Sequence, residues 1–170
     1  MKKEQFHQFI HWLFKPKMGK SYLIRIAVLA VVSFVFFRYF CLPMILTGGS
    51  MEPNYHSGTL NFCWAPTYWF RRPARGDVVV LRYAGERLML LKRIVALPGE
   101  TVEFRDGVLY VNGTPQEEPY IKNKREKWNL KPRKVSEGHY YVIGDNRSMP
   151  MEMHKFGEIR QNRVEGTLLL

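Results

Sequence analysis

The chain has 170 residues, 46% of them hydrophobic and 14% aromatic, which allows one membrane segment and one domain of ordinary size but not two full domains. Its net charge of +11 indicates contact with an anionic surface, and because this charge is spread along the chain we interpret it as a signal for membrane lipid and not for nucleic acid. The two cysteines, Cys41 and Cys63, exclude a disulfide framework and a cysteine-based metal site.

The first twenty residues are basic and amphipathic. Apolar side chains recur at helical spacing between residues 4 and 14, with lysines on both sides of them. This pattern is typical of a helix that lies on lipid headgroups. We therefore expect residues 1–20 to form a cytoplasmic segment at the membrane surface.

An apolar stretch follows and is interpreted as a membrane anchor. Residues 22–37 are almost wholly apolar, apart from Arg25, and Arg38 lies at the far edge. Extended to residues 21–42, with both arginines reaching outward, the segment is long enough to cross a bilayer. A cleaved signal peptide is the alternative, but bulky residues stand where a cleavage site needs small ones. The basic residues before the span predict that the N-terminus is inside and that residues 43–170 lie outside the inner membrane.

Beyond residue 43 the sequence changes to short β-type runs separated by Gly, Pro, Asn and Asp. The pairs Asp106-Gly107 and Asn112-Gly113 predict tight reversals, because these residues tolerate positive φ angles. No run is convincingly helical, so we expect a mainly β fold: an antiparallel, barrel-like domain preceded by one N-terminal transmembrane helix. The predicted strands cover residues 59–64, 77–83, 87–97, 101–105, 108–111, 139–143 and 163–169.

Residues 122–134 are mostly basic, and Trp128 and Leu130 are the clear hydrophobic residues among them. Such a run predicts a solvated loop. Contact with the lipid surface through Trp128 is the second interpretation, and nucleic-acid binding is the third.

The stretch Gly48-Gly49-Ser50-Met51-Glu52-Pro53 has the composition of a presented nucleophile. Glycines before a serine allow a sharp turn and let a substrate carbonyl approach the serine amide. A serine hydroxyl is a weak nucleophile at neutral pH, so this interpretation requires a base elsewhere in the chain. A plain Gly-Ser turn is the alternative.

Two further blocks carry polar groups in unusual places. Lys92 lies in a strongly apolar predicted strand, where burial would lower the pKa of its amine enough for it to accept the Ser50 proton. A paired or outward-reaching lysine is the alternative. Arg93 cannot lose its proton, so we expect it to have a carboxylate partner. Asp145, which ends another predicted strand, could bind Arg93 or cap an exposed turn.

Three blocks in fixed order resemble the conserved boxes of the type I signal peptidases, which are Ser/Lys membrane proteases. These are Ser50-Met51-Glu52-Pro53, the run from Lys92 to Glu100, and Gly144-Asp145-Asn146-Arg147. Residues 75–80, 108–113 and 118–120 also resemble segments of that family. The resemblance extends from about residue 47 to residue 166.

The resemblance implies a β-fold serine endopeptidase that removes signal peptides from preproteins at the outer face of the cytoplasmic membrane. Ser50 would be the nucleophile and Lys92 the general base, with no metal and no cofactor. The Ser50 amide, together with the Gly48 backbone or a nearby group, would form the oxyanion hole. Met51 would wall the lysine pocket.

Further residues near the site have structural roles by the same resemblance. Arg93 and Asp145 would form an ion pair, and Asn146 would lie beside them. Where many members have a serine that orients the lysine, this chain has Pro150, so Ser148 is the expected substitute. Glu152 and His154 stand where the family has an Asp and an Arg, and they are expected to mimic that ion pair.

Other functions stay open at this stage. A dedicated maturation protease of one secretion or conjugation system would use the same chemistry. An inactive membrane-anchored β domain that binds a partner would explain the altered last box. The two classes differ in whether Ser50 and Lys92 approach within hydrogen-bond reach.

Overall fold

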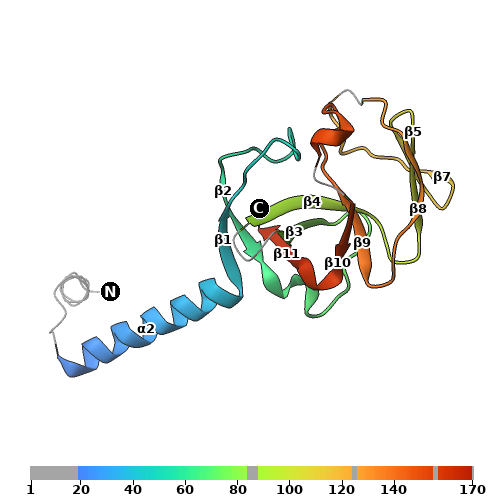
Figure 1. Cartoon of the computed structure of the whole chain (residues 1–170). Coiled ribbons are helices and arrows are strands. Elements are labelled where there is room, and N and C mark those ends of the chain that lie inside the picture. Colours follow the sequence, from blue (N-terminus) through green and yellow to red (C-terminus); the bar gives the residue numbers. More distant parts are fainter. Residues whose placement is uncertain (1–18, 84–87, 124–125, 155–156, 170) are drawn as a thin grey trace, which may run out of the picture. The chain divides into compact units, whose positions relative to one another are not determined.

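The computed structural model describes residues 19–83, 88–123, 126–154 and 157–169 (Figure 1). The chain divides into two compact units, Met1–Tyr39 and Phe40–Leu170. Most of the expected cytoplasmic segment, residues 1–18, lies outside the described residues.

The first unit contains the helix α2, Lys20–Tyr39. Its 20 residues have a mean hydropathy of 1.9, and none of them is buried. At 1.5 Å per residue the helix is about 30 Å long, which matches the hydrocarbon layer of a bilayer. The helix ends before Leu42, the expected limit of the anchor, because Cys41 and Leu42 pair with the next strand of the folded unit.

The second unit contains a seven-stranded sheet in which every pairing is antiparallel. Its strand order is β1-β2-β11-β3-β4-β9-β10. The strands are β1 (Cys41–Ile45), β2 (Leu60–Trp64), β3 (Val78–Tyr83), β4 (Leu88–Ala96), β9 (His139–Ile143), β10 (Gly157–Arg160) and β11 (Val164–Leu169).

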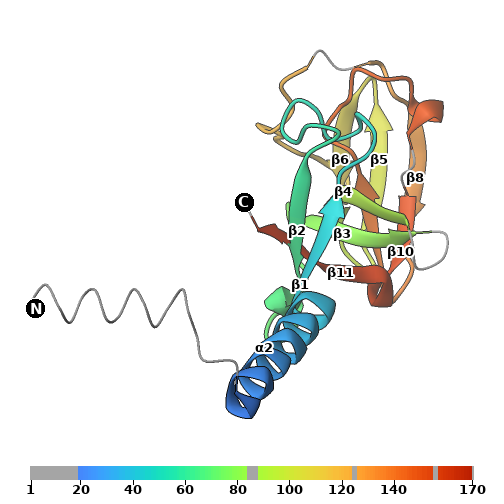
Figure 2. The same ribbon diagram turned by 90° about the vertical axis from the view of Figure 1, so that its left-hand side faces the viewer.

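A second antiparallel sheet has the order β7-β6-β5-β8. It lies on the far side of the unit from β1 and β2 in Figure 1, and Figure 2 shows β6, β5 and β8 next to one another. Its strands are β5 (Thr101–Arg105), β6 (Val108–Val111), β7 (Thr114–Pro115) and β8 (Leu130–Lys134). Asp106 and Gly107 connect β5 to β6 with φ angles of 46° and 82°, which is the predicted tight reversal. Short 3-10 helices are η1 (Ala65–Tyr68), η2 (Met151–Met153) and η3 (Gln161–Arg163).

The predicted fold class is confirmed, and each of the seven predicted strands is present with its ends within one residue. Four further strands were not predicted: β1, β7, β8 and β10. β1 follows the apolar helix almost directly and contains Pro43. In the sequence its first residues are therefore indistinguishable from the end of the apolar anchor. β8 is rich in basic residues, most of whose side chains are exposed, so its composition resembles that of a loop. Its place in the sheet is set by backbone pairing with β5.

Trp128 belongs to the core between the sheets, so the interpretation of this residue as a lipid contact is wrong. Only 3% of its surface is exposed, and it packs edge-to-face against Phe104 at 5.7 Å. Its indole nitrogen donates a hydrogen bond to the Met149 carbonyl at 2.9 Å. Burial of this large ring outweighs the basic character of the residues around it.

Candidate active site

Ser50 and Lys92 are brought together by the turn between β1 and β2 and by the middle of β4. A hydrogen bond joins Lys92 Nζ to Ser50 Oγ. Lys92 is 2% exposed and lies opposite Val79 in the β3–β4 ladder. Gly48 has a φ of +90°, so the turn that presents Ser50 needs a glycine there.

The turn after β9 holds the backbone on which Ser50 lies. The Asn146 amide donates to the Ser50 carbonyl at 2.9 Å, and Asn146 Nδ2 donates to the Gly49 carbonyl at 2.8 Å. Gly144 packs so closely that a Cβ on it would be 2.1 Å from the backbone carbonyl oxygen of Ser50. From the sequence, Asn146 was expected only to lie near the site, and Gly144 was given no role of its own, although a glycine at the end of a buried strand is a signal for close approach.

The amide groups next to Ser50 differ in their hydrogen bonds. Among the described residues, none accepts a hydrogen bond from the Ser50 amide. The Gly48 amide instead donates to Ser57 Oγ at 3.1 Å. The Gly48 amide is engaged by Ser57 because the turn folds back on that residue, and the role of the Ser50 amide in an oxyanion hole stays a prediction.

Arg93 and Asp145 form the expected ion pair, with Nε–Oδ1 and Nη2–Oδ2 distances of 2.8 Å and 2.7 Å. The Asp145 side chain is fully buried. Asn54 Nδ2 donates to the same carboxylate at 2.9 Å, and the Tyr120 ring lies 3.9 Å from the guanidinium carbon. This bidentate pair joins β4 to the turn that holds Ser50.

A second buried ion pair was not predicted. Arg147 Nη2 lies 2.6 Å from Glu118 Oε1, and the two side chains are 2% and 0% exposed. Arg147 Nε also donates to the Gly144 carbonyl at 2.9 Å. Sequence analysis matched Arg147 to a family box but gave no partner, because Glu118 is far away in the sequence and follows an unremarkable turn.

The altered last box departs from the expectation for the Glu152–His154 pair. Ser148 Oγ donates to Asn146 Oδ1 at 2.6 Å, and its role in orienting Lys92 stays a prediction. Glu152 is exposed, whereas His154 is buried and neither of its ring nitrogens has a hydrogen-bond partner among the described residues. No Glu152–His154 ion pair is formed there, because the chain turns one side chain outward and the other inward. Burial lowers the pKa of His154, and with the smaller effects of the charges of Lys92 and then Arg147 the value falls to about 4.

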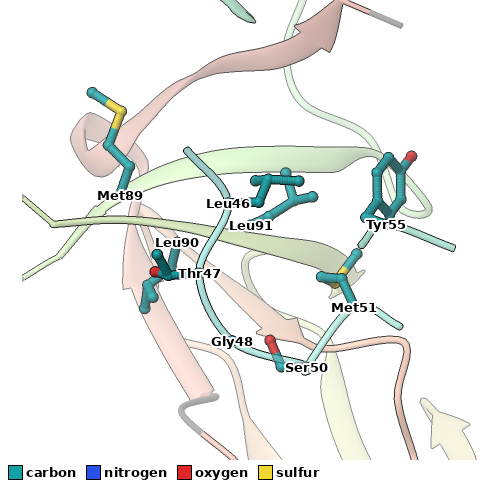
Figure 3. Close-up of a pocket in the computed structure, with 9 residues that line it drawn as sticks. All are labelled: Leu46, Thr47, Gly48, Ser50, Met51, Tyr55, Met89, Leu90 and Leu91. Atoms are coloured by element: carbon teal, nitrogen blue, oxygen red, sulfur yellow. The ribbon is translucent and has the colours of Figure 1, made fainter. Parts of the chain in front are cut away.

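A small cavity of about 20 Å³ opens beside Ser50 between the 46–51 segment and β4. Figure 3 shows Ser50 and Met51 next to each other on one side of it, with Leu46 and Leu91 beyond them. Met51 is 3% exposed, packs with Leu46 and Leu91 in one apolar cluster, and lines this cavity beside Ser50. The lining residues are Leu46, Thr47, Gly48, Ser50, Met51, Tyr55, Met89, Leu90 and Leu91.

Within the described ranges, no group of three His, Cys, Asp or Glu side chains is placed to hold a metal ion. The arrangement of a buried amine hydrogen-bonded to a serine hydroxyl is suited instead to nucleophilic catalysis.

The chain is similar to signal peptidases. The family model "Signal peptidase, peptidase S26" matches residues 19–170. Signal peptidase I of Bacillus licheniformis is 33% identical over 155 residues, which cover 85% of this chain and 83% of that protein. Signal peptidase I T of Bacillus subtilis (strain 168) is 31% identical over 175 residues, covering 97% and 86% of the two chains. A crystal structure of a signal peptidase I from Enterococcus faecalis V583 has a TM-score of 0.48 and 34% identity, and covers 58% of this chain and 98% of that chain. The chain therefore belongs to the signal peptidase family, peptidase S26, and is a serine endopeptidase of the signal peptidase I type.

Proposed function

We propose that this protein is a membrane-anchored enzyme that removes N-terminal signal peptides from exported preproteins, with Ser50 as nucleophile and Lys92 as general base. The observation that carries the proposal is the hydrogen bond between Lys92 Nζ and Ser50 Oγ. The names of the related proteins, which are signal peptidases, support the choice of substrate.

The mechanism follows from the burial of the lysine. Lys92 is 2% exposed, and burial disfavours the charged ammonium, so a neutral amine is available to take the proton from Ser50 Oγ. The alkoxide attacks the scissile carbonyl, and the Lys92 ammonium then gives its proton to the leaving amine. A water molecule, activated by the same amine, hydrolyses the acyl-enzyme and frees Ser50. The Ser50 amide stabilises the oxyanion that forms at each stage.

The site has room for an extended substrate with a small side chain. β9 pairs with β4 from Arg93 to Ala96, and in the described part of the chain no strand covers the same side of β4 from Leu88 to Lys92. A preprotein could add there as a strand, with its backbone hydrogen-bonded to β4. A cavity of about 20 Å³ holds little more than one water-sized group, which favours small residues before the cleaved bond.

The helix α2 is proposed as a single membrane anchor. Its length and apolar surface suit a bilayer, and the lysines before it favour a cytoplasmic N-terminus. The β domain would then lie on the outer side of the inner membrane, where exported preproteins emerge. An inactive β domain is disfavoured, because a chain without activity has no need to keep a buried lysine against a serine.

Substitution of the two proposed catalytic residues tests this function. We expect Ser50→Ala and Lys92→Ala each to reduce cleavage of a preprotein in detergent by more than about 1,000-fold, because the two groups act as a unit. Circular dichroism checks that each variant keeps its β structure. The matched controls are Ser136→Ala and Lys127→Ala, both at exposed positions, which we expect to cleave at the normal rate. Normal cleavage by either the Ser50 or the Lys92 variant would remove the dyad.

A further inference from the structure

A second cavity, much larger than the one beside Ser50, lies in a part of the β domain to which the proposed reaction gives no role. Its volume is about 430 Å³, within the range of about 300–1,000 Å³ that is typical of small-molecule sites. It is lined by η1 and the segment that follows it, and by residues of β9, η3 and β11. Neither Ser50 nor Lys92 lines it, so this cavity is separate from the proposed catalytic pair.

The lining of this cavity carries one arginine whose charge is not balanced. Arg71 pairs with Asp77 at 2.7 Å, and Glu165, which also lines the cavity, pairs with Arg82 at 2.8 Å. Among the described residues, no carboxylate or other acceptor binds the exposed guanidinium of Arg72. A guanidinium without a carboxylate partner is suited to bind a phosphate group, whose oxygens match its planar set of donors.

A tyrosine supplies a second open hydrogen-bond donor. Tyr140 on β9 is 3% exposed and lines the cavity. Within the described ranges its hydroxyl has no hydrogen-bond partner, whereas the Tyr68 hydroxyl on the same lining donates to Asp77 at 3.0 Å. Hydroxyls of buried side chains are nearly always hydrogen-bonded in native proteins, so an open one at a cavity indicates an occupant with acceptor oxygens.

Chain continuity connects the cavity with the end of the proposed anchor. Phe40 is the first residue of the β domain and directly follows Tyr39, the last residue of α2. The Phe40 carbonyl accepts a hydrogen bond from the Ala65 amide at 3.0 Å, and its ring packs against Trp69 at 5.3 Å. A helix of this length that spans the bilayer ends near the headgroups, so the residues packed on Phe40 lie near them as well. Trp69 lines the cavity, which is therefore level with the lipid headgroups.

The surface next to the cavity is aromatic and apolar. Trp69 is 56% exposed and Phe70 is 91% exposed. Aromatic side chains of this kind are typical of the interface between a bilayer and water. We propose that the cavity binds the phosphate of an anionic phospholipid, with Arg72 and Tyr140 as donors and with Trp69 and Phe70 against its acyl chains. The unbalanced positive charge favours a lipid with a net negative charge over a zwitterionic one. This inference rests on the proposed role of α2 as a membrane anchor.

Trp69 offers a readout for the site that needs no catalytic activity. The full chain in a non-ionic detergent is titrated with phosphatidylglycerol that carries brominated acyl chains, because bromine quenches an indole that it contacts. The part of the quenching that is lost in Trp69→Phe reports on this cavity and not on the other tryptophans. We expect half of this signal to be quenched at a concentration roughly tenfold lower for phosphatidylglycerol than for brominated phosphatidylcholine.

Substitution of the proposed donor tests which residue binds the phosphate. We expect Arg72→Gln to raise the phosphatidylglycerol concentration for half-quenching roughly 10- to 100-fold, since a hydrogen-bonded charge pair is lost. The matched control is Lys131→Gln, which removes the same charge from an exposed position on β8 and should leave the titration unchanged. Equal titrations for Arg72→Gln and the unaltered chain, or no quenching of Trp69 at all, would overturn the proposal.

Inorganic phosphate distinguishes a lipid from a free anion. Added at the same concentration as the lipid, it should not relieve the quenching of Trp69, because it lacks the acyl chains that contact Trp69 and Phe70. Relief of the quenching would show a site for a free anion and would overturn the assignment to a lipid. Extraction of the full chain from vesicles by alkaline carbonate would instead remove the anchor on which the inference rests. Failure of the Ser50–Lys92 dyad is recognised separately by cleavage assays and does not change the lipid titration.

Discussion

At the scale of single residues, the position of Ser50 depends on two neighbours in the turn after β9. Asn146 holds the carbonyls of Gly49 and Ser50, and Gly144 leaves room for the Ser50 backbone. A nucleophile held by its main chain is oriented before substrate binds, which is the condition for efficient attack.

Gly144→Ala should therefore disturb the nucleophile directly. The added Cβ would lie 2.1 Å from the backbone carbonyl oxygen of Ser50 and 3.0 Å from the Ser50 Cβ, so the serine has to move. We expect a loss of about 1–3 kcal/mol in the free energy of unfolding from overpacking, and a loss of cleavage of about 100-fold in the protein that remains folded.

Gly166→Ala is the matched control for this substitution. Its Cβ would lie 2.2 Å from the Trp64 oxygen, a similar clash between β11 and β2, with no contact to Ser50 among its closest neighbours. We expect similar destabilisation in urea unfolding but near-normal cleavage per folded molecule. Equal losses of cleavage in the two variants would contradict a specific role for Gly144.

Single site residues could be predicted from the sequence where their chemistry is unusual for their surroundings. Ser50 between glycines and a bulky pair, and Lys92 in an apolar strand, stand out without coordinates. The burial of His154 and Trp128 does not, because each lies in a polar or basic stretch and is placed inside only by contacts distant in sequence. The Glu152–His154 pair was expected from the position of two residues in a box, and this gives no information on which side chain turns inward.

At the scale of elements, two buried ion pairs join the strands that meet at the site. Arg93–Asp145 connects β4 to the turn after β9, and Arg147–Glu118 connects that same turn to the segment between β7 and β8. Breaking a buried ion pair lowers the stability of the fold strongly, because removal of one partner leaves the other charge buried without compensation.

Glu118→Gln is expected to destabilise the protein by about 3–5 kcal/mol, since Arg147 would stay buried with its countercharge removed. Urea unfolding followed by tryptophan fluorescence measures this. The control is Glu103→Gln, which removes the partner of the exposed Arg105 and should leave the unfolding midpoint almost unchanged, because the remaining guanidinium is solvated. A small effect of Glu118→Gln would mean that Arg147 is not held by this pair.

Elements were predictable from sequence where local pattern and tertiary context agree. β5, β6 and β9 begin and end as predicted, because alternation and turn residues bound each of them. β1, β8 and β10 were missed for the opposite reason. β1 continues an apolar run, β8 has a basic composition typical of a loop, and β10 is short and is fixed by its pairing with β9.

At the scale of the whole molecule, an apolar helix is joined to a basic β domain. The two compact units meet in the chain between Tyr39 and Phe40, so the β domain begins directly after the helix. Length and composition were enough to predict one helix followed by one domain. The end of the helix was not predictable, because both the helix and β1 are apolar and only strand pairing separates them.

The stability of the whole molecule should depend on pH through His154. Its pKa of about 4 in the folded protein is below the value of 6.5 for an unperturbed histidine, so the unfolded chain binds more protons between these values. The stabilisation is fully present above about pH 6.5 and is lost as the pH falls toward about 4, by up to about 3 kcal/mol. Urea unfolding at the two ends of this range measures the loss, which should be much smaller in His154→Gln. An equal loss in that variant would contradict this assignment.

The central claim is that a neutral Lys92 amine removes the proton from Ser50, and Lys92→Arg tests it most directly. The guanidinium keeps the positive charge and hydrogen-bond donors of a lysine ammonium but stays protonated, so it cannot serve as a base. We predict that purified Lys92→Arg protein, folded by circular dichroism, cleaves no preprotein at neutral or alkaline pH. Cleavage at a rate close to that of the unaltered chain would contradict the account.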